Sequence, residues 1–288
     1  MRAAVVGHVE WVTFMRVDHT PKVGDIVHAR EWWEQPGGGG AGAAVQLAKL
    51  CGSCDFYTAL GDDELGKRAR NELSSLGVRV HAAVRNDPTR RAVTHVDEVG
   101  ERTITVLGRR LEPAEADPLP WDQLARVDAV YFTAGDVGAL RRARSARFVV
   151  ATARVLSFLQ QTGVQLDALV SSANDPGEAY ADGDLDPAPG LVIRTDGDKG
   201  GTYATTEGPT RPYAPVEPPR PIVDRYGAGD SFAAGVTYAL GAGMAPEDVV
   251  AFAARCGAWV ITGRGPFEAQ LVLERSDADG TDQSSEES

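Results

Sequence analysis

The chain has 288 residues, 43% of them hydrophobic, and a formal net charge of -12. That length and apolar content are enough to bury a large core, either as one big domain or as a big domain with a small partner. The acidic balance argues against a nucleic-acid partner, because such proteins gather Lys and Arg on one face and this chain has no basic block. The three cysteines fit a reducing compartment better than a disulfide framework.

The chain begins with a short apolar run, Ala3 to Val6, that stops at Gly7. This run is too short for a signal peptide or a membrane span, so we expect a cytoplasmic protein with no membrane partner. Strand-like and helix-like patterns then alternate, which predicts an α/β fold with a central, mostly parallel sheet flanked by helices on both faces. The predicted strands are 3–6, 56–59, 129–133, 148–151, 168–171 and 191–194, and the predicted helices are 41–50, 64–76, 155–161, 231–240 and 246–261.

Two stretches interrupt this alternation. Residues 10–34 and 80–107 contain period-two patterns that are typical of antiparallel strands with one exposed face. We interpret them as one small sheet, built from two insertions, that covers a cleft as a lid. The Pro-rich run 207–221 is interpreted as a connector. The main domain is then expected to span residues 1–274, and the acidic Ser/Gly/Asp segment 275–288 is expected to be a disordered tail.

The segment 224–235, with the sequence DRYGAGDSFAAG, is the most informative. Its glycines predict a tight turn that leads into a buried helix, so that bare N–H groups and the helix dipole form a site for phosphate oxygens. Asp230 follows this turn directly. A carboxylate at a helix start is often only a cap, but beside an anion site it would repel phosphate unless it had a task, such as holding an acceptor hydroxyl.

These residues resemble the ribokinase-like (PfkB) family of carbohydrate and nucleoside kinases, whose signature is DTxGAGD followed by Phe and an Ala-Gly pair. The match departs at Arg225 and Tyr226, where the family usually has small hydroxyl residues. The resemblance implies an α/β kinase with a small β-sheet lid that closes over the sugar and often pairs subunits, so a homodimer through the lid is expected. It assigns the anion hole to Gly227, Ala228 and Gly229 and the catalytic base to Asp230, with Asp224 near the nucleotide.

An amino-terminal glycine motif fits the same family. Residues 36–40, PGGGG, lead into a predicted helix and resemble the motif that contacts the sugar. The asparagine that the family usually places there appears as Gly42, so one substrate hydrogen bond is lost or moved. The only carboxylate near the end of the first strand is Glu10, where the family often grips sugar hydroxyls with an Asp. The substrate-binding residues implied are Glu10, Gly37, Gly38, Gly39 and Gly42.

Further motifs of that family follow in order up to about residue 267. Residues 61–66 fit its GxDxxG pattern, and residues 261–265 resemble the region near the adenine. Asn174 and Glu178 resemble its NxxE motif with one extra residue, so Glu178 is the stronger candidate for ordering magnesium. The nucleotide-binding residues implied are Asn174, Thr195, Gly197, Lys199, Gly200 and Asp224.

The resemblance therefore implies transfer of phosphate from ATP, with Mg²⁺, to a hydroxyl of a sugar or sugar-like molecule, and it leaves the need for a monovalent cation open. A nucleoside kinase of the same fold and a non-catalytic sugar-binding relative are the alternatives. A dinucleotide-dependent oxidoreductase is a remote one, because Gly37, Gly39 and Gly42 satisfy GxGxxG without the preceding hydrophobic strand that this motif needs. Lid residues Arg90, Arg91 and Arg102 either bind an acidic or phosphorylated sugar or are merely solvated.

Overall fold

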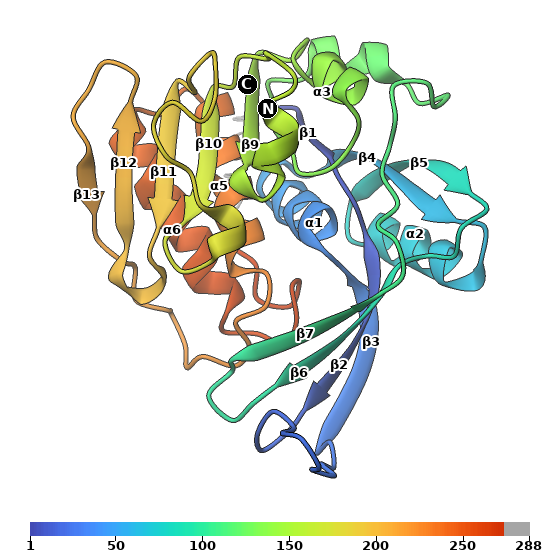
Figure 1. Cartoon of the computed structure of the whole chain (residues 1–288). Helices are drawn as coiled ribbons and strands as arrows, with labels where there is room; N and C mark the ends of the chain where they lie inside the picture. The colour runs from blue at the N-terminus through green and yellow to red at the C-terminus, as the bar shows by residue number, and fades with distance from the viewer. Residues whose placement is uncertain (274–288) are drawn as a thin grey trace, which may run out of the picture.

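The computed structural model describes residues 1–273, so the predicted acidic tail at 275–288 lies outside the described residues. A twisted nine-stranded sheet forms the body, and a smaller four-stranded sheet projects from one end of it (Figure 1). Neighbouring strands of the large sheet pair in parallel, except at one edge, where residues 201–205 pair antiparallel with both of their neighbours. Its order is β13 (Arg211–Tyr213), β12 (Gly201–Thr205), β11 (Leu191–Thr195), β10 (Ala168–Ser172), β9 (Phe148–Thr152), β8 (Ala129–Phe132), β1 (Ala3–Val6), β4 (Cys54–Gly61) and β5 (Val78–Arg85).

Helices cover both faces of this sheet, as predicted. Along β1, Ala3 and Val5 belong to one hydrophobic cluster while Ala4 and Val6 belong to the other, because successive side chains of a strand point to opposite faces. The first face carries α1 (Gly39–Cys51), α2 (Glu64–Ser75), α5 (Ala228–Gly241) and α6 (Pro246–Val260), and the second carries the 3₁₀ helix η1 (Trp121–Arg126), α3 (Val137–Ala143) and α4 (Leu156–Leu159). None of the helices in residues 1–273 is long and apolar enough to cross a membrane.

The small sheet is the predicted lid, and its order is β3 (Glu31–Gly37), β2 (Glu10–Arg16), β6 (Arg91–Val96) and β7 (Arg102–Leu107). Two expectations about it were wrong. Residues 80–85, which were predicted to be in the lid, belong to β5 (Val78–Arg85) and pair in parallel with β4. Their alternating pattern arises because β5 is an edge strand of the large sheet with one partly exposed face. In addition, β2 and β6 pair in parallel, not antiparallel.

Smaller differences concern the second half of the chain. The helix predicted at 155–161 is only one turn of α-helix, Leu156–Leu159, after a 3₁₀ turn at Ala153–Val155. The connector at 207–221 contains β13, which pairs with the unpredicted strand β12. Both strands are short and extend the sheet at its edge, where burial is weak and the apolar signal is correspondingly faint.

Candidate active site

The glycine-rich turn forms as predicted at the start of α5. Gly227 has a left-handed backbone conformation, with φ of 82°, which favours glycine at this position. Asp224 is fully buried, and its two carboxylate oxygens accept from the N–H groups of Tyr226, at 2.8 Å, and Gly265, at 3.0 Å. Burial raises its pKa. Asp224 therefore holds the turn together, and its expected contact with a nucleotide stays a prediction.

The turn leaves main-chain donors free at the entrance of α5. Its first backbone bond runs from the N–H of Ser231 to the carbonyl of Gly227, at 2.9 Å, and within residues 1–273 the N–H groups of residues 228–230 have no backbone partner. A Cβ atom added at Gly229 would meet no atom within 4 Å, so space is open beside these donors. Free N–H groups, the positive end of a helix dipole and open space together form an anion-binding site.

Asp230 lies in the first turn of the same helix. Its carboxylate has no hydrogen bond or ion pair with residues 1–273. Burial, followed by the negative charge of Glu178, raises the pKa of Asp230 to about 6, while Arg102 and Arg154 oppose the rise. The group is thus ionised at neutral pH but holds a proton more readily than an ordinary aspartate, which is a property suited to a general base.

The amino-terminal glycine motif packs directly against this carboxylate. Gly38 begins α1 with φ of 85°, and a Cβ atom added at Gly39 would lie 2.9 Å from Oδ1 of Asp230. A Cβ atom at Gly42 would lie 3.2 Å from Cβ of Asp230. The glycines therefore leave room for Asp230, and a side chain at Gly42 would contact this aspartate.

The two departures from the family signature both contact the lid. The hydroxyl of Tyr226 accepts from the N–H of Gly38, at 3.0 Å, and its ring packs edge-on against Phe14 in the core of the lid. Nε of Arg225 lies 2.8 Å from Glu101, beside the β6–β7 turn. Neither role is evident from local sequence, because Tyr226 and Gly38 are 188 residues apart. Tyr226 thus joins the anion-hole turn, the glycine motif and the lid.

Glu10, the predicted substrate residue, is 6% exposed at the start of β2. Oε2 of Glu10 lies 3.3 Å from Nε of Arg90, and burial raises the pKa of the Glu10 carboxyl. A Cβ atom added at Gly38 would lie 3.1 Å from Nε2 of His8 and 3.3 Å from Cγ of Glu10. Sequence reasoning missed His8, although it closely follows the end of β1, where ligands of parallel sheets bind.

The predicted nucleotide residues gather at the carboxyl ends of β10 and β11. Nδ2 of Asn174 donates to Oδ1 of Asp196, at 3.1 Å, which brings Asn174 beside the turn that contains the exposed Lys199. The hydroxyl of Thr195 donates to the carbonyl of Ser171, at 3.2 Å. Gly197 and Gly200 both have positive φ, and a Cβ atom at Gly200 would lie only 2.2 Å from the carbonyl oxygen of Tyr213.

Glu178, the predicted magnesium residue, has a cationic partner that sequence reasoning missed. Its Oε1 accepts from Nε of Arg154, at 3.0 Å, and from a terminal nitrogen of the same guanidinium, at 2.8 Å. Arg154 also binds Asp175, at 2.6 Å. Residues 1–273 contain no group of three or more His, Cys, Asp or Glu side chains that could hold a metal. Arg154 thus already engages both carboxylates, and the role of Glu178 in ordering magnesium stays a prediction.

Comparison with known proteins places the chain among carbohydrate kinases. The chain matches the family described as "pfkB family carbohydrate kinase" over residues 2–182 and 178–270. It is 28% identical to a fructokinase of Klebsiella pneumoniae over 276 residues, which cover 81% of this chain and 88% of that protein. It is 27% identical to an ATP-dependent ribose-1-phosphate kinase of Halopiger xanaduensis, over 90% of this chain and 91% of that protein.

A solved structure shares the fold at lower sequence identity. A putative ribokinase from Agrobacterium tumefaciens superposes with a TM-score of 0.79 and 20% identity, over 93% of this chain and 94% of that one. The family match covers nearly the whole described chain and includes both the turn at Gly227 and the glycine motif. The chain therefore belongs to the pfkB family of carbohydrate kinases, and it is an ATP-dependent carbohydrate kinase with a ribokinase-like fold.

Proposed function

We propose that the protein transfers the γ-phosphoryl group of ATP to a hydroxyl of a sugar, with Asp230 as the general base. The observation that carries this proposal is an unpartnered aspartate, with its pKa raised to about 6, that stands beside free N–H groups at the entrance of a buried helix. A base and an anion site that lie next to each other are what an in-line transfer to a hydroxyl requires.

In the proposed reaction the acceptor hydroxyl lies between the glycine motif and Asp230. Its oxygen attacks the γ-phosphorus, the bond from that phosphorus to the β-phosphate oxygen breaks, ADP leaves, and the hydroxyl proton passes to Asp230. The N–H groups of Gly227, Ala228 and Gly229 are proposed to stabilise the charge on the phosphoryl oxygens. Phosphoryl transfer asks the protein mainly for positioning and charge neutralisation.

The nucleotide is proposed to lie along the carboxyl ends of β10 and β11, next to the turn at 195–200. Arg154 forms an ion pair with Glu178, and its positive charge lowers the pKa of Asp230. The guanidinium group of Arg154 is therefore proposed to lie along the path of the phosphate chain. Mg²⁺, when bound, would neutralise the β- and γ-phosphates, and Glu178 with Asn174 would orient it through water. Dependence on a monovalent cation, and pairing of two copies through the lid, stay predictions.

Replacement of Asp230 by Asn tests the assigned base. We expect ADP formation in the presence of a phosphorylatable sugar to fall by about 10²- to 10⁴-fold, as is typical for loss of a general base. Asp248 offers a matched control, because it is an exposed aspartate in the first turn of α6. Asp248→Asn should leave turnover unchanged. Full turnover by Asp230→Asn would contradict the proposal.

The alternatives predict different results in the same assay. A nucleoside kinase would release ADP with nucleosides and not with sugars, and a non-catalytic relative would bind sugar without release of ADP. The oxidoreductase alternative has weak support, since the glycines of residues 37–42 follow β3, a lid strand, whereas a dinucleotide motif follows a parallel strand of the main sheet.

A further inference from the structure

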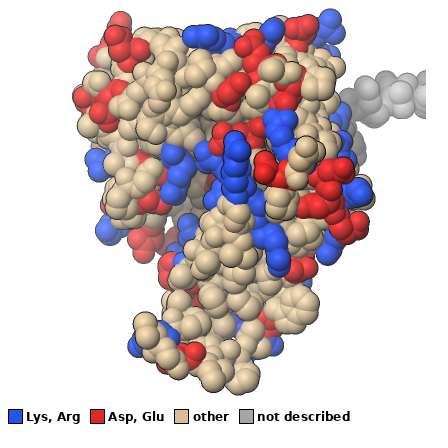
Figure 2. All heavy atoms as spheres, turned by 45° about the vertical axis from the view of Figure 1, so that its right-hand side comes forward, with Lys and Arg blue, Asp and Glu red and all other residues tan. Residues whose placement is uncertain are grey.

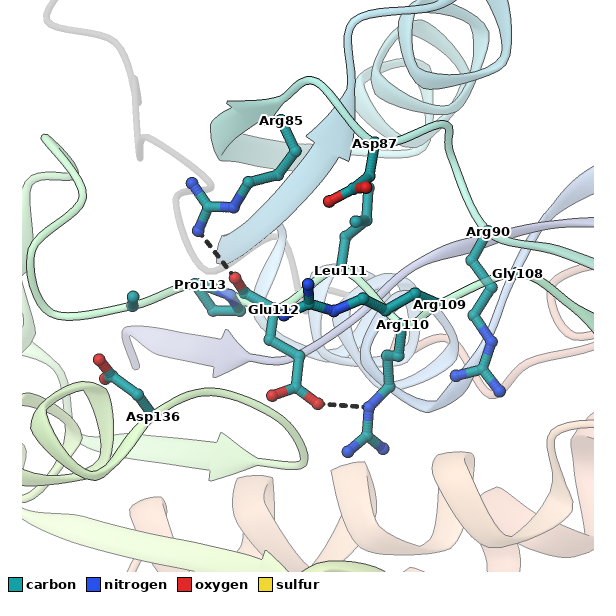
Figure 3. A pocket seen from close by; sticks show the side chains of 11 residues that line it. Arg85, Asp87, Arg90, Gly108, Arg109, Arg110, Leu111, Glu112, Pro113 and Asp136 are labelled. Atoms are coloured by element: carbon teal, nitrogen blue, oxygen red, sulfur yellow. Dashed lines mark hydrogen bonds and ion pairs between the residues drawn. The ribbon is translucent and has the colours of Figure 1, made fainter.

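A hollow lined by arginines lies between the lid and the large sheet. Its volume is about 710 Å³, and it is bounded by the end of β5, the segment before β6, the chain after β7 and the loop after β8 (Figure 3). Figure 2 shows Lys and Arg atoms gathered at the middle of the face where the lid meets the body. The cationic side chains that line the hollow are Arg85, Arg90, Arg109 and Arg110.

Two of these arginines are not fully satisfied within the protein. Nε of Arg90 is buried and forms no hydrogen bond in residues 1–273, although it lies 3.3 Å from Glu10. Arg109 has no ion pair with any described residue. Arg110 pairs with Glu112, and in Figure 3 the side chains of Arg90 and Arg110 run in the same direction. Partly free guanidinium groups in a hollow are suited to bind carboxylate or phosphate oxygens.

Two of the three acidic side chains of the same hollow already have partners within the protein. Asp136 caps α3 by accepting from the N–H of Ala139, at 2.7 Å, and Glu112 is held by Arg110. Arg85 is bound to Asp117, which lies outside the hollow's lining. Asp87 is the remaining carboxylate of the lining. The lining thus carries four arginines and three carboxylates, while Asp117 and Glu10 pair with Arg85 and Arg90 from outside it. Arg109 is the arginine of the lining that forms no ion pair with a described residue.

This charge lies on the acceptor side of Asp230. Burial, followed by the positive charges of Arg110 and Arg90, lowers the pKa of His8 to about 3. The same two arginines also favour the ionised form of the Glu10 carboxyl, against the effect of its burial. His8 and Glu10 contact the glycine motif at Gly38, whereas Arg154 lies near the predicted nucleotide residues. The hollow therefore extends the place where a sugar would lie, and not the place of the nucleotide.

We propose that the acceptor sugar carries an anionic oxygen group, a phosphate or a carboxylate, which Arg110 binds together with Arg90 and Arg109. This inference rests on the proposed function. A neutral sugar would leave the buried Nε of Arg90 without a hydrogen bond, which costs free energy, and would leave the exposed Arg109 to water alone. An anionic group would satisfy them and would also fix which hydroxyl faces Asp230.

Matched acceptors test this proposal on the whole chain. ADP release is measured with fructose, fructose 6-phosphate, fructose 1-phosphate, ribose, ribose 1-phosphate, gluconate and 2-keto-3-deoxygluconate. We expect kcat/KM for at least one anionic sugar to exceed that of its neutral counterpart by about 100-fold, the worth of one or two charge-assisted hydrogen bonds. Activity with phosphates only, or with acids only, identifies the source of the anion. Equal kcat/KM for neutral and anionic sugars would overturn the proposal.

Variants locate the binding group. Arg110→Gln should raise KM for the preferred anionic sugar by about 10- to 100-fold while kcat/KM for neutral sugars changes little. Arg109→Gln serves as a second variant, because its side chain has no ion pair to lose within residues 1–273. Arg141→Gln is the matched control, since Arg141 is exposed on α3 and does not line the hollow. Equal losses for anionic and neutral sugars in Arg110→Gln and Arg109→Gln would contradict the assignment.

Calorimetric titration of the wild type and both variants with the same sugars separates this proposal from the proposed function. Arginine-dependent binding without ADP release would reject the kinase mechanism and keep the anion site. ADP release with neutral sugars alone would reject the anion site and keep the kinase mechanism.

Discussion

The two sides of Asp230 differ in how far their polar groups are satisfied. On the proposed nucleotide side the charged side chains pair with one another: Arg154 binds both Asp175 and Glu178, and Asn174 binds Asp196. The hydroxyl of Tyr213, beside Gly201, is buried there without a hydrogen bond in the described chain. On the acceptor side, Nδ1 of His8 and Nε of Arg90 are buried without a hydrogen bond in the described chain. A set of groups that satisfy one another needs no particular ligand, whereas buried groups without partners favour one that completes them. Acceptor specificity is therefore expected to reside under the lid.

The largest effect is expected when a side chain fills the proposed anion site itself. Gly229→Ala adds a methyl group where nothing lies within 4 Å, so the fold should tolerate it, and alanine is the better helix former. If a phosphoryl group occupies that space, kcat should fall by about 10²- to 10³-fold, comparable with the loss of an oxyanion-hole donor. Thermal melting would verify that the fold is intact. A stable variant with full activity would place the phosphoryl group elsewhere.

The next test concerns pH. As the proposed base, Asp230 must be deprotonated to accept the hydroxyl proton, and its pKa is raised to about 6, so activity should be present above that pH and lost below it. We expect kcat/KM to fall about tenfold per pH unit on the acid side. Measurement of kcat/KM from pH 4.5 to 8 gives the midpoint. A flat profile down to pH 4.5 would mean that Asp230 is not the titrating base.

Arg154 links the two sides through charge. Its guanidinium lowers the pKa of Asp230, so Arg154→Gln should move the acid limb to higher pH, and it should also release Glu178. We expect kcat at pH 7 to fall by about tenfold, the value of one charge-assisted contact. Arg154→Lys keeps the charge but not the planar fork, so its acid limb should stay nearer to that of the wild type. Identical pH profiles for all three proteins would exclude the coupling.

The smallest expected effect concerns the tie between lid and turn. Tyr226→Phe leaves the N–H of Gly38 buried without its acceptor, which should destabilise the fold by about 1 kcal/mol. KM for the acceptor should rise a few-fold while KM for ATP is unchanged, because Gly38 lies on the acceptor side. Tyr238→Phe is a suitable control, since that ring packs on Phe252 away from the lid. A change in KM for ATP alone would assign the tie to the nucleotide side.

The sequence by itself determined the parts of the site that are local in the chain. The turn at residues 227–229 and the helix after it depend on neighbouring residues, because glycine conformation, helix dipole and apolar periodicity all act within a few positions. The alternation of strands and helices likewise predicted the layered sheet, in which β1 and β8 to β11 lie close to their expected positions.

Only the tertiary structure decided which side chains form ion pairs with one another and which strands pair. Arg154 and Glu178 are 24 residues apart, and Arg90 and Glu10 meet only because β2 and β6 pair in the lid. Assignment of residues 80–85 to the large sheet instead of the lid also depended on pairing, since an edge strand and a lid strand show the same alternation. Ion pairs and strand pairing join distant segments, so their physical cause is the packed chain and no local pattern records it.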